Sequence, residues 1–183
     1  TQTKLSVLNR VFKLYDADPT DLVFYLRDEN EGVEDEAGTR YELRRKYWTY
    51  ALEMIKEDHG EGGCFSNVNT SKENWVSGFF GISGFNISCI ANFDLARVDL
   101  YFGQAKKAEN KKAFDALIAH KEDIEKTLGV QLIWNRGDDI KSSKVSYQLS
   151  GVSISNETDW LQMARFHAEW SKKFYDVLLP YLN

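Results

Sequence analysis

Histidine and cysteine, the side chains that most often carry catalysis or bind a metal, are few in this sequence. The three histidines are His59, His120 and His167, and the two cysteines are Cys64 and Cys89. None of them shows the short, regular spacing of a zinc site or of a nucleophile with its base. We expect two reduced, structural thiols, as is usual in the cytoplasm. The sequence therefore predicts no catalytic residue, no metal and no cofactor.

Two segments match the carboxylate–lysine pattern of metal-dependent nucleases, but only in the spacing of their residues along the chain. In that pattern the carboxylates hold divalent ions, and a lysine positions the attacking water. Asp99 precedes Glu109-Asn110-Lys111, which opens a predicted helix, and Asp139-Ile140-Lys141 falls in a predicted turn. A metal-dependent nuclease or other nucleic-acid enzyme is therefore the alternative function. A cluster of Asp99, Glu109 and Lys111 in space would favour it.

Some residues of the predicted sheet are better suited to binding than to catalysis. The candidate binding residues are Arg97, Tyr101, Trp134, Arg136 and Lys144. Arginine and lysine contact phosphates, and aromatic rings stack on bases. However, Asp99 lies among these residues, and the chain carries a net charge of -5. Because affinity for nucleic acid comes mainly from neutralised phosphates, we expect any such binding to be weak without a partner domain.

Alternating apolar and polar residues predict the strands that hold these side chains. Four strands are expected, at about Gly84–Phe93, Leu95–Phe102, Val130–Asn135 and Ser143–Leu149. A period of two places the apolar side chains on one face, against helices, and the polar ones on the other. The expected polar face consists of Asn86, Ser88, Arg97, Asp99, Tyr101, Lys144, Ser146 and Gln148. Such a face is either simply solvated or a docking platform.

Three segments have the apolar spacing of amphipathic helices. They begin at Thr39, at Lys106 and after Asn156 or Thr158, and the last is expected to end before Pro180. Residues 64–81 are expected to be irregular and anchored by Trp75. The prediction is an α+β fold, in which an antiparallel sheet of about four strands carries three helices mainly on one face. The opposite face is polar.

An acidic run, Asp28–Glu36, predicts a boundary near Gly38. We expect an N-terminal extension with an acidic linker at 1–38, including a helix near Lys4–Tyr15, and the α+β module at 39–183. No apolar run reaches membrane-spanning length, so we expect a cytoplasmic protein without membrane contact. The pattern leaves the oligomeric state open.

Motifs spread over most of the module resemble a known family. The residues that carry the resemblance are Ala96–Tyr101, Asn110-Lys111, Phe114–Leu117, Lys121, Ile124-Glu125, Gly129 and Leu132–Trp134, with Tyr47-Trp48, Trp75, Gly81–Gly84, Ser142–Val145, Asp159-Trp160 and Phe174-Tyr175. Together they resemble the uncharacterised bacterial module catalogued as domain of unknown function 4268, over about Tyr41–Leu182. Asp99 and Lys144 stand where that pattern tends to have Glu and Arg, and both keep the charge.

Modules of this family often follow a nuclease-like domain in bacterial and archaeal proteins, some of them linked to defence against foreign DNA. The resemblance therefore implies a non-catalytic interaction or specificity module associated with a nuclease-type or defence-related protein. Its expected ligand is a partner protein, such as a nuclease-like domain, or nucleic acid.

Overall fold

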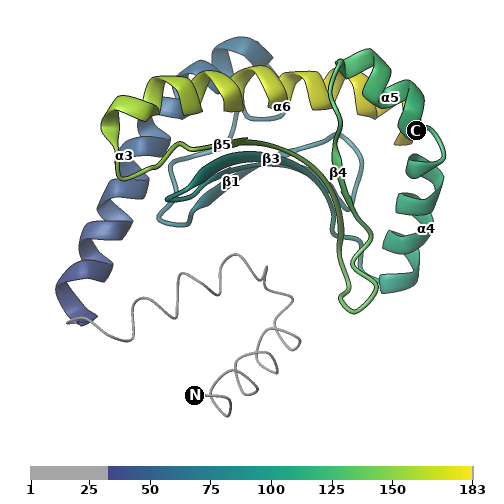
Figure 1. Cartoon of the computed structure of the whole chain (residues 1–183), viewed down its shortest axis with the longest axis horizontal. Coiled ribbons are helices and arrows are strands. Elements are labelled where there is room, and N and C mark those ends of the chain that lie inside the picture. Colours follow the sequence, from purple (N-terminus) through teal and green to yellow (C-terminus); the bar gives the residue numbers. More distant parts are fainter. Residues whose placement is uncertain (1–32, 183) are drawn as a thin grey trace.

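The computed structural model describes residues 33–182 and shows one curved antiparallel sheet under a layer of helices (Figure 1). The predicted helix near Lys4–Tyr15 and most of the predicted 1–38 extension lie outside the described residues. Within these residues, the predicted α+β class, the antiparallel sheet and the covering of mainly one face are confirmed.

The sheet has five strands in the order β1-β2-β3-β5-β4, and every neighbouring pair is antiparallel. The strands are β1 (Trp75–Phe79), β2 (Phe85–Ala91), β3 (Leu95–Phe102), β4 (Ile133–Asn135) and β5 (Ser143–Ser150). The last four correspond to the four predicted strands, and β4 and β5 form a hairpin. The strand that was not predicted, β1, occupies a segment that was expected to be irregular.

The helices lie on the convex side of the sheet (Figure 1). They are α3 (Val33–His59), α4 (Lys107–Ile118), α5 (Lys121–Leu128) and α6 (Trp160–Leu182), the last preceded by the short 3-10 helix η1 (Glu157–Asp159). In Figure 1, α6 runs along the sheet with α3 beside it, and α4 and α5 cover the end where the β4–β5 hairpin lies.

Three predicted helix boundaries are wrong. The first helix begins at Val33 rather than Thr39, so Thr39 lies inside the helix and does not cap it. The expected helix from Lys106 to Leu128 is divided after Ile118 into α4 and α5. The last helix continues through Pro180 to Leu182. A proline so near the end removes only one backbone hydrogen bond, while the preceding turns are already fixed by packing.

The strands bury the face that their alternation predicts. Ile87, Leu100 and Val145 are fully buried beneath the helices, and Phe102 packs edge-on against Phe114 of α4 with ring centroids 5.8 Å apart. Alternate residues of the same strands turn to the opposite side. The period of two in the sequence therefore determines which side of the sheet is covered.

Trp75 does not anchor an irregular segment, as was expected, because it begins β1 and is 48% exposed. The buried centre of this region is Gly78. A Cβ atom there would lie 2.8 Å from the Cys64 carbonyl oxygen and 2.9 Å from the Phe65 ring. Glycine is required at this position because the 64–65 turn packs directly on the strand.

No helix among residues 33–182 combines the length and the apolar character that crossing a bilayer requires.

Candidate functional site

The side of the sheet that carries none of the described helices, here called the helix-free face, is the concave side in Figure 1. Strand register arranges its residues in three rows across the sheet. The rows are Trp75, Ile90, Arg97 and Gln148; Ser77, Ser88, Asp99, Ser146 and Ile133; and Phe79, Asn86, Tyr101, Lys144 and Asn135. Every residue of the predicted polar face lies in one of these rows. The sequence did not show that large apolar residues share the face.

An ion pair occupies the middle of the helix-free face. The Nε atom of Arg97 lies 2.9 Å from Oδ1 of Asp99, and the two side chains are only 11% and 6% exposed. Beside them, the hydroxyl oxygens of Ser77 and Ser88 lie 2.6 Å apart. The centre of the face is therefore polar and closely packed, and the charge of Arg97 is offset by Asp99.

Large apolar side chains stand at the two edges of this polar centre. Trp75 and Phe79 project from β1 and are 48% and 58% exposed, and Ile133 projects from β4 and is 48% exposed. Exposing such side chains to water is unfavourable, and large exposed apolar patches commonly mark binding surfaces. The helix-free face thus has a polar centre between two apolar edges, and the side chains of Trp75, Phe79 and Ile133 are here called its apolar rim.

Tyr101 and Lys144 are direct partners across β3 and β5 on this face, and both are half-buried. The Tyr101 ring lies over Gly103, where a Cβ atom would come within 2.8 Å of the ring. The missing side chain of Gly103 therefore leaves the space in which the ring lies. The structure thus brings together Arg97, Tyr101 and Lys144, three of the five candidate binding residues.

The other two candidates lie elsewhere. Trp134 is turned to the helix side, where its Nε1 donates to Oε1 of Glu125 at 2.9 Å and its ring contacts Phe114. Arg136 is held at the hairpin, where Nε and Nη2 donate to the two carboxylate oxygens of Asp115 at 2.7 and 2.9 Å. The hydrogen bonds from Arg136 also lower the pKa of Asp115. Both side chains join the hairpin to α4 and α5 rather than serving the helix-free face.

The nuclease-like constellation does not form. Lys111 lies on the helix side, 6% exposed, and its Nζ donates to the carbonyls of Arg136 at 2.6 Å and Ser142 at 2.5 Å. Asp99 faces the opposite side of the sheet. Among the described residues, no group of three or more His, Cys, Asp or Glu side chains could hold a metal ion. The arrangement that would have favoured a nuclease is therefore missing from residues 33–182.

A polar network that the sequence did not reveal lies where α3 ends. His59 places Nδ1 3.3 Å from Sγ of Cys64 and Nε2 2.9 Å from the hydroxyl of Ser171. The same hydroxyl also lies close to the Cys89 thiol. Burial raises the pKa of the Cys64 thiol to about 12, so it stays protonated at neutral pH and is a poor nucleophile. We interpret the network as structural, because Ser171 is fully buried.

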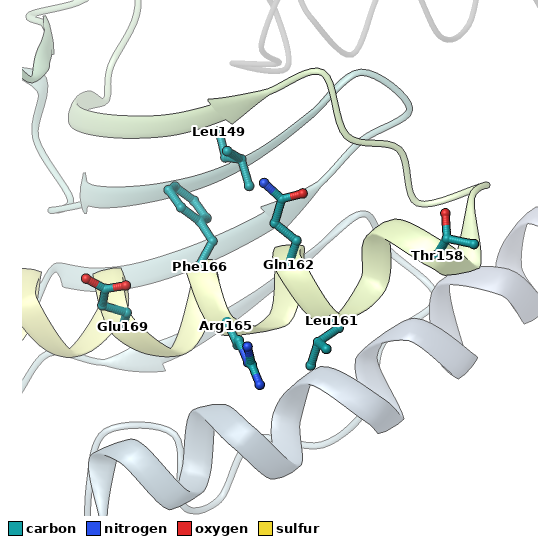
Figure 2. A pocket seen from close by; sticks show the side chains of 7 residues that line it. All are labelled: Leu149, Thr158, Leu161, Gln162, Arg165, Phe166 and Glu169. Carbon is teal, nitrogen blue, oxygen red and sulfur yellow. The ribbon is translucent and has the colours of Figure 1, made fainter.

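A shallow groove of about 440 Å³ lies between β5 and α6 on the outer side of the molecule (Figure 2). Its lining residues are Leu149, Thr158, Leu161, Gln162, Arg165, Phe166 and Glu169. In Figure 2, Leu149 points from the strand toward Gln162 and Phe166 of the helix. No pattern in the sequence indicates this groove, because its residues come from two elements that only the tertiary fold brings together.

The fold and its sites define a class of small α+β domain in which helices cover one face of an antiparallel sheet and the other carries an apolar rim. The chain belongs to the family described as "Domain of unknown function (DUF4268)", whose profile matches residues 43–182. The resemblance inferred from the motifs is thereby confirmed. No curated protein and no solved structure matches the chain significantly.

Proposed function

We propose that this chain is a non-catalytic interaction module that binds a partner protein through the helix-free face. The observation that carries the proposal is the exposure of Trp75, Phe79 and Ile133 on that face. Tryptophan and other large side chains supply most of the binding energy in protein interfaces. Because a β-sheet holds these side chains at fixed positions, little conformational entropy is lost when a partner covers them.

The charges of the face favour a protein over a nucleic acid. Binding of a single strand combines aromatic platforms with a positively charged groove. The cations of the helix-free face are Arg97 and Lys144, and Asp99 offsets the first of them. A face with so little net positive charge attracts phosphates weakly. Its apolar rim and hydrogen-bonding centre suit a protein surface better.

The kind of partner is suggested by the domains that neighbour this module in longer proteins of the family. Because such modules often follow nuclease-like domains, we propose a nuclease-type or defence-related protein as the partner. The module would then position that protein or contribute to its specificity, and would not catalyse a reaction itself.

A capture experiment with a double variant of the rim tests this function. Tagged wild-type protein and Trp75→Ser/Phe79→Ser protein are recovered from the native cells, and the bound proteins are quantified by mass spectrometry. Ile118→Ser is the matched control, because Ile118 is an exposed apolar residue of α4 on the covered side. Unchanged circular dichroism spectra and melting temperatures establish that all three proteins are folded.

We expect a nuclease-type protein to accompany the wild type and Ile118→Ser and to be depleted from the double variant. Loss of about 2 kcal/mol, the usual size of one hot spot, lowers affinity roughly thirtyfold. Equal recovery with the double variant would exclude the rim as the docking surface. A wild-type protein with no specific companion would overturn the proposal as a whole.

A further inference from the structure

We propose that the outer edge of β5 at Tyr147–Ser150 accepts an extended segment of a partner protein as an additional strand of the sheet. Side chains of that segment would enter the groove beside α6. This surface is separate from the rim of the helix-free face, so the proposal stands independently of the proposed function.

The first observation is the unequal pairing of β5. On one side β5 pairs with β3 along its whole length, from Ser143 opposite Phe102 to Ser150 opposite Leu95. On the other side β4 pairs only with Lys144–Ser146. Within residues 33–182, the stretch Tyr147–Ser150 therefore has no strand on its outer side. Such an edge offers unpaired backbone N–H and C=O groups, which an incoming strand satisfies.

The second observation is that this edge borders the groove. Leu149 is one of the four edge residues, and its side chain forms one wall opposite Gln162 and Phe166 (Figure 2). Phe166 lines the groove, and its ring packs against that of Tyr147 with centroids 5.8 Å apart, so this wall of the groove is apolar and firmly packed. Because side chains alternate along a strand, every second residue of an added strand would turn toward this groove.

The charges of the groove specify the chemistry of the segment. Glu169 is paired with Lys173, whose Nζ lies 2.6 Å from its carboxylate. Arg165 also lines the groove, its side chain pointing in Figure 2 to the side of α6 away from Leu149, and it makes no ion pair with any described residue. The groove therefore combines the apolar side chains of Leu149, Leu161 and Phe166 with an unbalanced positive charge from Arg165. It fits an extended segment in which an apolar side chain is accompanied by Asp or Glu.

Selection from a phage-displayed library of random octapeptides tests the inference without knowledge of the natural partner. The whole chain is the bait, and the dissociation constant of the most enriched peptide is then measured by fluorescence polarisation. Arg165→Glu is the test variant. Lys112→Glu, which reverses an exposed charge on α4, is the matched control. Hydrogen exchange with and without peptide locates the bound strand.

We expect enriched peptides to combine an apolar residue with a nearby carboxylate. Their binding should weaken about tenfold in Arg165→Glu and stay unchanged in Lys112→Glu. Amide exchange at Tyr147–Ser150 should slow on binding, because an added strand supplies new hydrogen bonds there. A peptide that merely sat in the groove would leave this exchange rate as it was.

The inference is overturned if no peptide is enriched, if exchange at Tyr147–Ser150 does not slow, or if Arg165→Glu binds as tightly as the wild type. The Trp75→Ser/Phe79→Ser protein separates this result from the proposed function. It should keep full affinity for the peptide even though it loses the partner of the helix-free face. A peptide that is lost in that variant alone binds the helix-free face, and the β5 edge is then excluded.

Discussion

Several buried polar side chains of this protein are held by partners on distant elements, and His167 is the clearest case. It is fully buried, with Nδ1 2.7 Å from the hydroxyl of Tyr47 and Nε2 2.9 Å from the carbonyl of Ile90. Since a carbonyl can only accept, Nε2 carries the proton and Nδ1 accepts from Tyr47. The ring thus joins α6 to α3 and β2 in its neutral form, and burial lowers its pKa to about 4.

Because His167 is neutral in the folded protein, we expect the protein to lose stability in mild acid. Its folded pKa of about 4 lies below the ordinary value of 6.5, so the unfolded chain binds the proton more readily. The contribution is therefore fully present above pH 6.5 and is lost as the pH falls toward 4. The difference corresponds to roughly 3 kcal/mol. Urea unfolding at pH 7.0 and 4.5 measures this loss.

The control for this prediction is His167→Gln, which cannot titrate. We expect it to be less stable than the wild type at pH 7.0 but to lose less stability between the two pH values. A pH dependence identical in the two proteins would show that other groups cause the acid destabilisation.

Replacing the buried Lys111 should also lower the free energy of unfolding. Its ammonium group supplies hydrogen bonds to the carbonyls of Arg136 and Ser142, and Lys111→Met would leave both acceptors without this donor. We expect a cost of about 1–3 kcal/mol, because the Ser142 carbonyl loses this donor while the Arg136 carbonyl still accepts from the Ser143 hydroxyl. Lys112→Met, at the exposed next position, should change the free energy of unfolding by less than about 0.5 kcal/mol. Similar values for both variants would contradict the structural role of Lys111.

Part of the candidate site was readable from single residues. Arg97, Asp99 and Tyr101 alternate along one strand, so their common face followed directly from the period of two. That Asp99 would oppose an anionic ligand also followed from this spacing. The direction of Trp134 did not, because β4 has only three residues and Ile133 beside it is also apolar. Alternation gives no direction when both faces of a strand carry apolar side chains.

At the scale of the elements, α6 is the helix on which the layers depend. It contacts α3 and the strands β2, β3 and β5. Phe174 is fully buried and Trp170 is 8% exposed, so both lie on the buried side of this helix. Trp160, the first residue of the same helix, is only half-buried, and its Nε1 donates to the carbonyl of Ile154 at 2.7 Å.

Phe174→Ala should therefore lower the free energy of unfolding by roughly 3–5 kcal/mol, because it leaves a cavity between the helix layer and the sheet. Leu161→Ala, on the exposed side of the same helix, should cost less than about 0.5 kcal/mol. Chemical denaturation of both variants provides the measurement. An unchanged midpoint for Phe174→Ala would show that this part of α6 is not core.

The elements that the sequence predicted well are those with long, regular patterns. Strand β3 was predicted at its observed bounds, Leu95–Phe102, because apolar and polar residues alternate along its eight positions. The strand β1 was missed because it has only five residues, with Gly78 at a buried position. The break between α4 and α5 was missed because Leu117 and Ile124 are both fully buried, so the apolar spacing continues across it. The break contains no glycine or proline; α4 contacts β3, β5 and α6, whereas α5 contacts α6.

At the scale of the whole molecule, the net charge of -5 works against nucleic-acid binding. We expect labelled duplex and single-stranded DNA to show no saturable binding at low salt, because the helix-free face neutralises few phosphates. The Arg97→Ala/Lys144→Ala variant should then behave like the wild type. Tight, salt-sensitive binding by the wild type that the double variant loses would replace the protein partner by a nucleic acid.

The order of the strands also has a consequence for how the chain reaches its folded state. Strands β1, β2 and β3 follow one another in sequence and in the sheet, so they close through short turns. The pairing of β3 with β5 must instead bring together ends separated by residues 103–142. Loop-closure entropy and folding rate both depend on such separations. The three-strand meander should therefore pair early, whereas β5, which carries the proposed docking edge, joins late. Changes in β5 would then mainly alter the rate of unfolding, and changes in the meander the rate of folding.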